Sequence, residues 1–319
     1  MVIFDKGYNE TRNKFVRPLS KYYIQYRHLK NNNIKNILLT KTLNVVKNGT
    51  KEYLFYLNEE ALLKALLGDI FLFYIRSILQ REDFSVIEGD NRISPNWNIV
   101  THYYKSFFDA SLLLRLCFRG NLFLDKEYKK KLEEIMKVHL GMVIELDSNL
   151  FYYIENINGS LVLRVVKSDN NTHETVWQKV NELLEEIVIL ANKGSEEKAL
   201  ICSCLDINKK LSNTFPSQLR NKVNYQPLYG VEAIDKKLFA IVQNANWIKE
   251  IMSFDPKEVK SNDNRMLNVY VAYTTYIEKL GYRLLQDYFE MVGREDHILA
   301  QINSKRTEKI VISEIPFSY

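Results

Sequence analysis

Glycine and proline are scarce in this chain of 319 residues, which contains 11 Gly and 6 Pro. Together they are roughly 5% of the residues, against about 12% in average usage. Sandwiches and propellers need many tight turns, and these two residues dominate such turns. The shortage therefore argues against those folds and favours long helices.

Cysteine is also rare, with Cys117, Cys202 and Cys204 as the three in the chain. A secreted disulfide framework would use an even and larger set. Cys202 and Cys204 are separated by one residue, and no second Cys/His pair completes a zinc tetrad. We therefore expect three buried thiols and no metal site.

Long uninterrupted apolar runs are missing as well. The strongest run, residues 61–79, is interrupted by Lys64, Asp69 and Arg76, so it predicts a buried helix and not a membrane span. The N-terminal residues lack the basic-then-apolar order of a signal peptide. We expect a cytoplasmic protein without membrane contact.

Common catalytic motifs are absent from the sequence: no Walker-type loop, G-x-G-x-x-G, H-E-x-x-H or G-x-S-x-G occurs. Kinases, Rossmann dehydrogenases and common hydrolases are therefore poor interpretations, and no cofactor is expected. The five histidines are scattered, and each is expected to be structural or at the surface. His102 is the most interesting, because it precedes Tyr103 and Tyr104 in a predicted helix, and it is a candidate substrate-binding residue.

The remaining composition is that of a globular chain, with 46% hydrophobic and 26% charged residues. Helical spacing and capping signals predict helices within 5–30 and over about 58–81, 95–118, 126–140, 172–191, 195–211, 231–252 and 263–292. Strands are expected within 36–57, around Asn48-Gly49, and within 141–167, around Asn158-Gly159, and the C-terminal tail leans towards β structure. The sequence therefore predicts a mainly α fold, a helical bundle with small antiparallel β insertions.

The most informative segment is residues 213–227, NTFPSQLRNKVNYQP. Asn213 or Thr214 can cap a short helix, and Pro227 ends it. Within that helix Arg220 and Asn224 lie four residues apart, as do Asn221 and Tyr225, so each pair shares a face. The segment thus presents a guanidinium, two amides and a phenol together, a set suited to a phosphate or to a buried polar network.

This segment resembles the R-x4-H signature of HEPN domains, helical domains of prokaryotic toxins and defence proteins. Arg220 and Asn221 match its opening, and Tyr225 stands where the histidine is expected. The segment from Trp97 to Arg115 also looks like the first long HEPN helix. The resemblance covers residues 94–253 and implies an N-terminal helical and hairpin region at 1–93, a HEPN-like core with a β insertion near 141–167, and a C-terminal helix and tail at 254–319.

The family implies metal-independent RNA cleavage, in which the arginine stabilises the phosphorane while the 2′-hydroxyl attacks the adjacent phosphate. Arg220 and Tyr225 would be catalytic, and Asn221, Asn224 and His102 would bind substrate. RNA, and a second copy or a protein from the same operon, are the expected partners. Tyrosine is a weak base at pH 7. The alternative is therefore a non-catalytic interaction subunit of a defence complex, in which Arg220 and Asn224 bridge helices.

Overall fold

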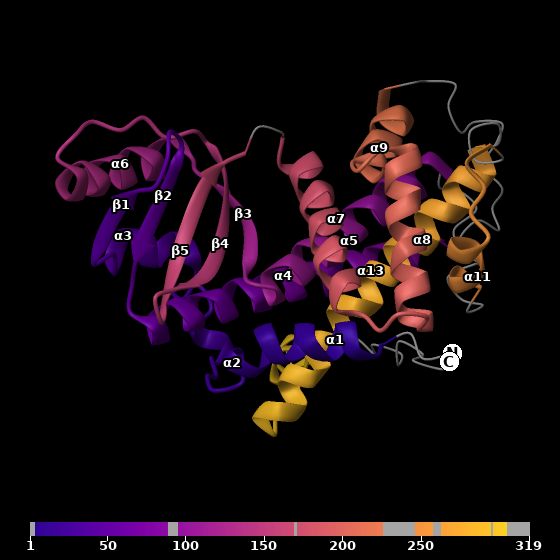
Figure 1. Ribbon diagram of the computed structural model, residues 1–319, viewed down its shortest axis with the longest axis horizontal. Helices are drawn as coiled ribbons and strands as arrows, with labels where there is room; N and C mark the ends of the chain where they lie inside the picture. The colour runs from indigo at the N-terminus through magenta and orange to yellow at the C-terminus, as the bar shows by residue number, and fades with distance from the viewer. Residues whose placement is uncertain are drawn as a thin grey trace.

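The computed structural model describes residues 4–88, 95–168, 171–225, 246–257, 263–294 and 296–304. The protein is mainly helical, with 68% helix and a small antiparallel sheet. Figure 1 shows the sheet on one side of the molecule and the helical bundle on the other. The predicted fold class is confirmed at this level.

The longest helices are α4 (Glu59–Glu88), α5 (Pro95–Leu116) and α13 (Asp263–Val292). The others are α1 (Lys6–Thr11), α2 (Arg17–Leu19), α3 (Ile34–Thr40), α6 (Lys126–Leu140), α7 (Thr172–Leu190), α8 (Glu196–Leu211), α9 (Phe215–Tyr225), α11 (Trp247–Met252) and α14 (His297–Asn303). A π-helical segment, Arg12–Val16, joins α1 to α2, and a 3₁₀ turn spans Tyr26–His28. The prediction over 126–140 matches α6, and that over 263–292 matches α13.

Helix α5 is the centre of the bundle, because it packs against α4, α13, α7 and α9. Large side chains fill the space around it: Tyr103, Trp177, Tyr270 and Tyr273 are each at most 1% exposed. Helix α4 extends from beneath the sheet into the bundle (Figure 1), so one continuous helix connects the two parts.

The sheet has the order β1-β2-β5-β4-β3, and every neighbouring pair is antiparallel. Its strands are β1 (Asn44–Lys47), β2 (Glu52–Tyr56), β3 (Arg119–Phe123), β4 (Asn149–Ile157) and β5 (Ser160–Lys167). Asn158 and Gly159 have φ values of 52° and 85° and form the predicted turn between β4 and β5. The two predicted β elements lie side by side, because β2 pairs with β5 from Glu52 opposite Val166.

Three local predictions were wrong. Residues 34–40 form a helix, because Ile34, Ile37 and Leu38 share one buried face and the Asn33 side chain accepts the N–H of Asn36. Residues 141–148, all of them described, form no strand. Gly120, just after the helix predicted over 95–118, lies not in a loop but in a strand that was not predicted, β3, where an added Cβ would come within 2.8 Å of the hydroxyl of Tyr152.

The cysteine prediction holds for Cys117 and Cys204, which are buried, but Cys202 is exposed. It lies on the outer side of α8, where solvent and not core surrounds the thiol. The predicted helix end at Pro227, most of the helix predicted over 231–252 and the tail after residue 304 lie outside the described residues.

Candidate functional site

The motif segment forms helix α9, which packs against α5 and α7. Phe215, Leu219 and Val223 fall at four-residue steps and are buried, so they fix which side of the helix faces the bundle. That orientation leaves Arg220 and Asn221 half-buried at the edge of the contact. Local sequence therefore determines where the motif side chains point.

Arg220 and Asn221 lie together, as the sequence predicted. A guanidinium N–H of Arg220 donates to Oδ1 of Asn221 over 2.9 Å. The guanidinium carbon is 5.3 Å from the ring centre of Tyr103 and 5.9 Å from that of Tyr104. The Nε–H of Arg220 is buried and has no hydrogen-bond partner among the described residues. The guanidinium of Arg220 thus lies against two tyrosine rings, and its Nε–H can still donate a hydrogen bond.

His173 joins this cluster from the first turn of α7. Its Nδ1 lies 3.0 Å from the hydroxyl of Tyr103, and its ring centre is 4.5 Å from that of Phe107. Tyr103 also receives the indole N–H of Trp177 at 3.4 Å. Because Nδ1 of His173 is hydrogen-bonded to Tyr103, Nε2 is the ring nitrogen that can contact a ligand.

Burial, followed by the nearby charge of Arg220, lowers the pKa of His173 to about 4. The imidazole is therefore neutral at pH 7 and can act as a hydrogen-bonding group or accept a proton. We call Arg220, Asn221, His173, Tyr103 and Tyr104 the Arg220 cluster. The sequence did not predict His173 or the two tyrosines in it, because they lie on α7 and α5, far from the motif along the chain.

Tyr225 and Asn224 are solvent-exposed, unlike the half-buried Arg220 and Asn221. Tyr225 is 74% exposed at the end of α9, and Asn224 is exposed as well. Five residues along a helix correspond to a rotation of about 140° around its axis, so Tyr225 projects from a different face than Arg220. Its expected role as the proton-transfer group beside Arg220 does not fit this position.

His102 also lies elsewhere, inside the bundle. It is 2% exposed, and its Nδ1 is 3.2 Å from the hydroxyl of Tyr270. Burial, with a smaller contribution from Lys105, lowers the pKa of His102 to about 3, so the ring is neutral. The substrate-binding role expected for His102 does not fit, because the side chain is enclosed by the core.

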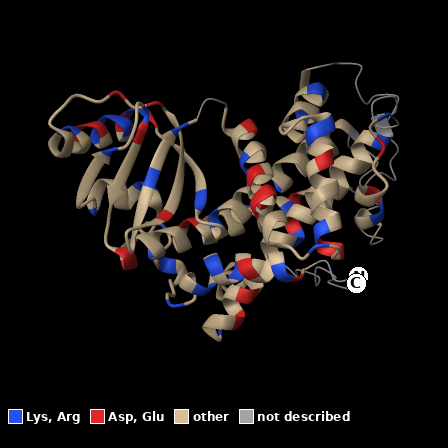
Figure 2. Ribbon diagram, in the orientation of Figure 1, with Lys and Arg blue, Asp and Glu red and all other residues tan. Residues whose placement is uncertain are grey.

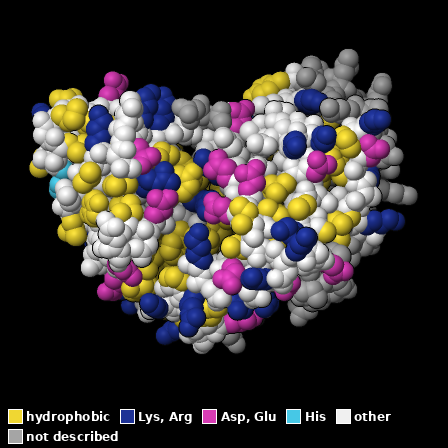
Figure 3. Space-filling view, in the orientation of Figure 1, with side chains coloured by type: hydrophobic (Ala, Val, Ile, Leu, Met, Phe, Trp, Pro, Cys, Tyr) yellow, Lys and Arg dark blue, Asp and Glu magenta, His cyan; other side chains and the backbone are white. Residues whose placement is uncertain are grey.

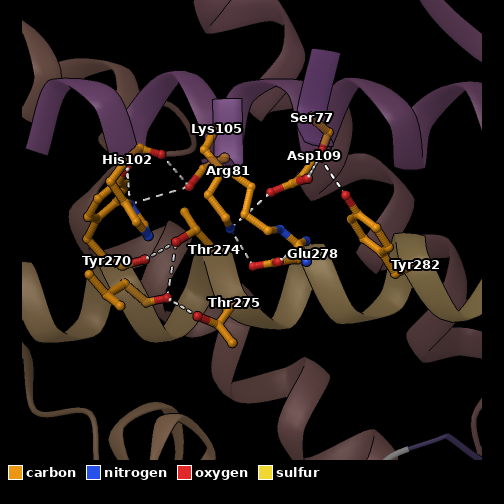
Figure 4. A network of polar contacts seen from close by, with 12 residues as sticks. Ser77, Arg81, His102, Lys105, Asp109, Tyr270, Thr274, Thr275, Glu278 and Tyr282 are labelled. Carbon is orange, nitrogen blue, oxygen red and sulfur yellow. Dashed lines mark hydrogen bonds and ion pairs between the residues drawn. The ribbon is translucent and has the colours of Figure 1, made fainter. Parts of the chain in front are cut away.

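Next to His102 lies a buried network of charged side chains, shown in Figure 4. Nζ of Lys105 is 2.5 Å from a carboxylate oxygen of Glu278 and 3.3 Å from one of Asp109. Arg81 forms an ion pair with the other oxygen of Glu278. Ser77 donates to Asp109 and lies 2.8 Å from the hydroxyl of Tyr282.

The network joins α4, α5 and α13 and pairs two cations with two anions. Burial alone would raise the pKa of Glu278, but Lys105 and Arg81 outweigh it and lower the pKa to about 2. Burial raises the pKa of Asp109 despite Lys105. The charges satisfy one another inside the bundle, which indicates a structural role for the network.

Basic and acidic side chains are intermingled over both parts of the molecule (Figure 2). Among the described residues no helix is long and apolar enough to cross a membrane. No protein-family model matches this sequence, and no curated protein or solved structure matches it. The function is therefore inferred from the geometry of the chain itself.

Proposed function

We propose that this chain is a HEPN-like component of a prokaryotic defence or toxin–antitoxin system that binds RNA at the Arg220 cluster. The supporting observation is the position of Arg220, half-buried on two tyrosine rings beside a neutral imidazole and an amide. A forked guanidinium binds a phosphate through two parallel hydrogen bonds. Among the described residues, basic and acidic side chains are intermingled in the view of Figure 2, so the proposed binding rests on the Arg220 cluster.

The same group supplies what metal-independent cleavage requires. The neutral His173 takes the proton of the 2′-hydroxyl at Nε2 as that oxygen attacks the adjacent phosphorus to form a cyclic phosphate. The bond from phosphorus to the 5′-oxygen breaks, and the leaving 5′-oxygen takes a proton from water. Arg220 stabilises the charge that develops on the phosphorane oxygens. In this proposal His173, and not Tyr225, is the acid–base group.

A second candidate function, a non-catalytic subunit, is favoured by the exposed end of α9. Tyr225 offers a large amphipathic side chain that is 74% exposed, and tyrosine is enriched at protein interfaces. A second copy of the chain or a protein of the same operon would then cover Asn224 and Tyr225.

The test is the binding of a fluorescent single-stranded RNA, measured by anisotropy over a range of salt concentrations. Arg220→Ala should weaken binding and reduce the slope of log K against log salt by about 0.7, because one phosphate contact is lost. Lys130→Ala removes an exposed cation on α6 and serves as the control. Equal affinity and slope for Arg220→Ala and the parent protein would contradict the proposal.

Cleavage in EDTA separates the two candidate functions. The RNase proposal expects activity in the parent protein, loss of it in His173→Gln and retention of it in Tyr225→Phe. RNA binding without any cleavage would leave a binding subunit. Light scattering of Tyr225→Ala then tests the interface, because that variant should lose any self-association that the parent protein has.

A further inference from the structure

A cleft of about 470 Å³ opens where the bundle meets the sheet, between α4, α5 and β3. Its volume falls within the roughly 300–1,000 Å³ of small-ligand sites. Helix α5 contributes Phe107, Phe108 and Arg115 to its wall, one to three turns beyond the tyrosines of the Arg220 cluster. The cleft is nonetheless a separate site, because Arg220 does not line it.

Arg115 is the most unusual residue of the cleft, because it is a cation only 3% exposed. Two of its N–H groups donate to the carbonyl oxygens of Ser111 and Asn121, at 3.0 and 3.1 Å. Its Nε–H, and Oδ1 of Asn121, are buried without a partner among the described residues. Unsatisfied buried polar groups are costly, so these atoms are places where a ligand can form hydrogen bonds.

Positive charge exceeds negative charge around the cleft. Lys35, Arg76 and Arg115 line it, with Asp69 as the acidic side chain among its lining residues. Burial raises the pKa of Asp69 to about 6 against the opposing charges of Arg115, Lys35 and Arg76. The surplus of cations favours an anionic ligand.

Aromatic rings lie beside each cation. The guanidinium of Arg115 is 3.5 Å from the ring centre of Phe73, and that of Arg76 is 5.2 Å from Phe73 and 5.9 Å from Phe108. Lys35 lies 5.7 Å from the ring of Phe123, which is 53% exposed. Flat apolar rings of this kind stack on planar bases, whatever the sequence.

A second hollow, of about 800 Å³, is useful for comparison, because its arginines are paired with carboxylates. It lies between the sheet and α7 and is visible in Figure 3 as an apolar floor with charges of both signs around it. There Arg119 pairs with both oxygens of Glu186, and Arg164 pairs with Glu155. Its arginines are thus neutralised by the chain itself.

From this contrast we infer that the cleft lined by Lys35, Arg76 and Arg115 binds a nucleoside phosphate. The phosphate would lie against Arg76 and Lys35, the base against Phe108 and Phe123, and the base edge against Arg115, Asn121 and Asp69. The ligand is either a free nucleotide or one nucleotide of an RNA strand, since both have the same chemistry. The inference is independent of the Arg220 cluster.

The test is calorimetric titration of the full chain with nucleoside 5′-monophosphates, with the corresponding nucleosides and with inorganic phosphate. Arg76→Ala changes an exposed side chain, so the fold should survive, and it should raise the Kd for nucleotide by about tenfold or more. The matched control is Arg164→Ala, which removes an arginine 4.2 Å from the Tyr153 ring in the other hollow and should leave the Kd unchanged.

Competition with a short single-stranded RNA separates the two sources. If RNA does not displace the bound mononucleotide, the natural ligand is a free nucleotide. If RNA displaces the mononucleotide from the Arg220→Ala protein, in which the Arg220 cluster is disabled, the ligand is a nucleotide of the strand. The inference is overturned if no mononucleotide binds and Arg76→Ala leaves RNA affinity unchanged, or if phosphate alone binds as tightly as nucleotide. Loss of RNA binding in Arg220→Ala with mononucleotide binding intact would support both sites separately.

Discussion

Replacing Lys105 with methionine tests whether the buried charges hold the bundle together. Methionine keeps the length of the side chain and its packing but removes the ammonium group, which lies 2.5 Å from Glu278 and 3.3 Å from Asp109. Both carboxylates stay buried, since Glu278 is 7% exposed and Asp109 is 1% exposed. Arg81 still pairs with Glu278, so Asp109 is the group that loses its ion pair.

Removing one partner of a buried pair costs about 3–5 kcal/mol, because the remaining charge has no compensation. Asp109 can reduce this cost by taking up a proton, since burial has already raised its pKa. We therefore expect a loss near 3 kcal/mol at neutral pH, and a smaller loss in acid, where the carboxyl is protonated.

Urea denaturation at several pH values measures this loss. Lys64→Met is the control, because Lys64 and Glu60 form an i,i+4 pair on α4 whose side chains are 38% and 59% exposed. Such a pair contributes at most about 1 kcal/mol. A loss for Lys105→Met no larger than that of the control, or one independent of pH, would refute the reasoning.

Two further predictions concern packing and protonation. Gly68→Ala should destabilise the fold by about 3 kcal/mol or more in urea denaturation, because the new Cβ would lie 1.6 Å from the carbonyl oxygen of Asn32. Gly49→Ala is the control and should have little effect, because its new Cβ would lie 3.7 Å from the nearest atom. The folded-state pKa of His173 is lowered to about 4, so the unfolded state binds its proton first as pH falls. The contribution of the neutral imidazole to the free energy of unfolding is therefore present above about pH 6.5 and is lost as pH falls towards 4. His173→Gln should remove about 1–2 kcal/mol of this dependence of stability on pH. An unchanged stability profile against pH would contradict the assignment.

Helix ends were predictable where a local cap determines them. Asp125 accepts the N–H of Tyr128 at the start of α6, and Gly141 has a φ of 67° just after its end. Both residues act within one turn, so the sequence alone contains the signal. The helix at Ile34–Thr40 had the same kind of cap at Asn33, but its isoleucine and leucine run was interpreted as a strand.

Strand β3 could not be predicted in this way. Its sequence, RGNLF, contains a glycine and two polar residues and has little strand character. Its place in the sheet depends on Gly120 lying opposite Tyr152 of β4, where a larger residue would strike the phenol ring. The reason for the glycine is therefore a contact with a residue more than thirty positions away.

In the candidate site, too, contacts within one helix were predictable from the sequence and contacts between helices were not. Adjacent motif residues, Arg220 and Asn221, were correctly predicted to lie together, because their proximity is a property of one helix. His173 was interpreted as an ordinary structural histidine, since it reaches the cluster only through the packing of α7 on α5. The motif comparison placed the acid–base group at Tyr225, but the packing of α9 leaves that side chain in solvent.

Helix α5 connects the buried charges with both proposed ligand sites. Tyr103 of the Arg220 cluster and Arg115 of the cleft lie on this helix, about 18 Å apart along its axis, and Lys105 and Asp109 lie between them. Apolar packing alone tolerates small shifts of a helix, whereas a shift of α5 would separate Lys105 from Glu278 on α13 and leave buried charges unpaired. The network therefore fixes the register of α5, and Lys105→Met should weaken ligand binding at both proposed sites even under conditions where the variant remains folded.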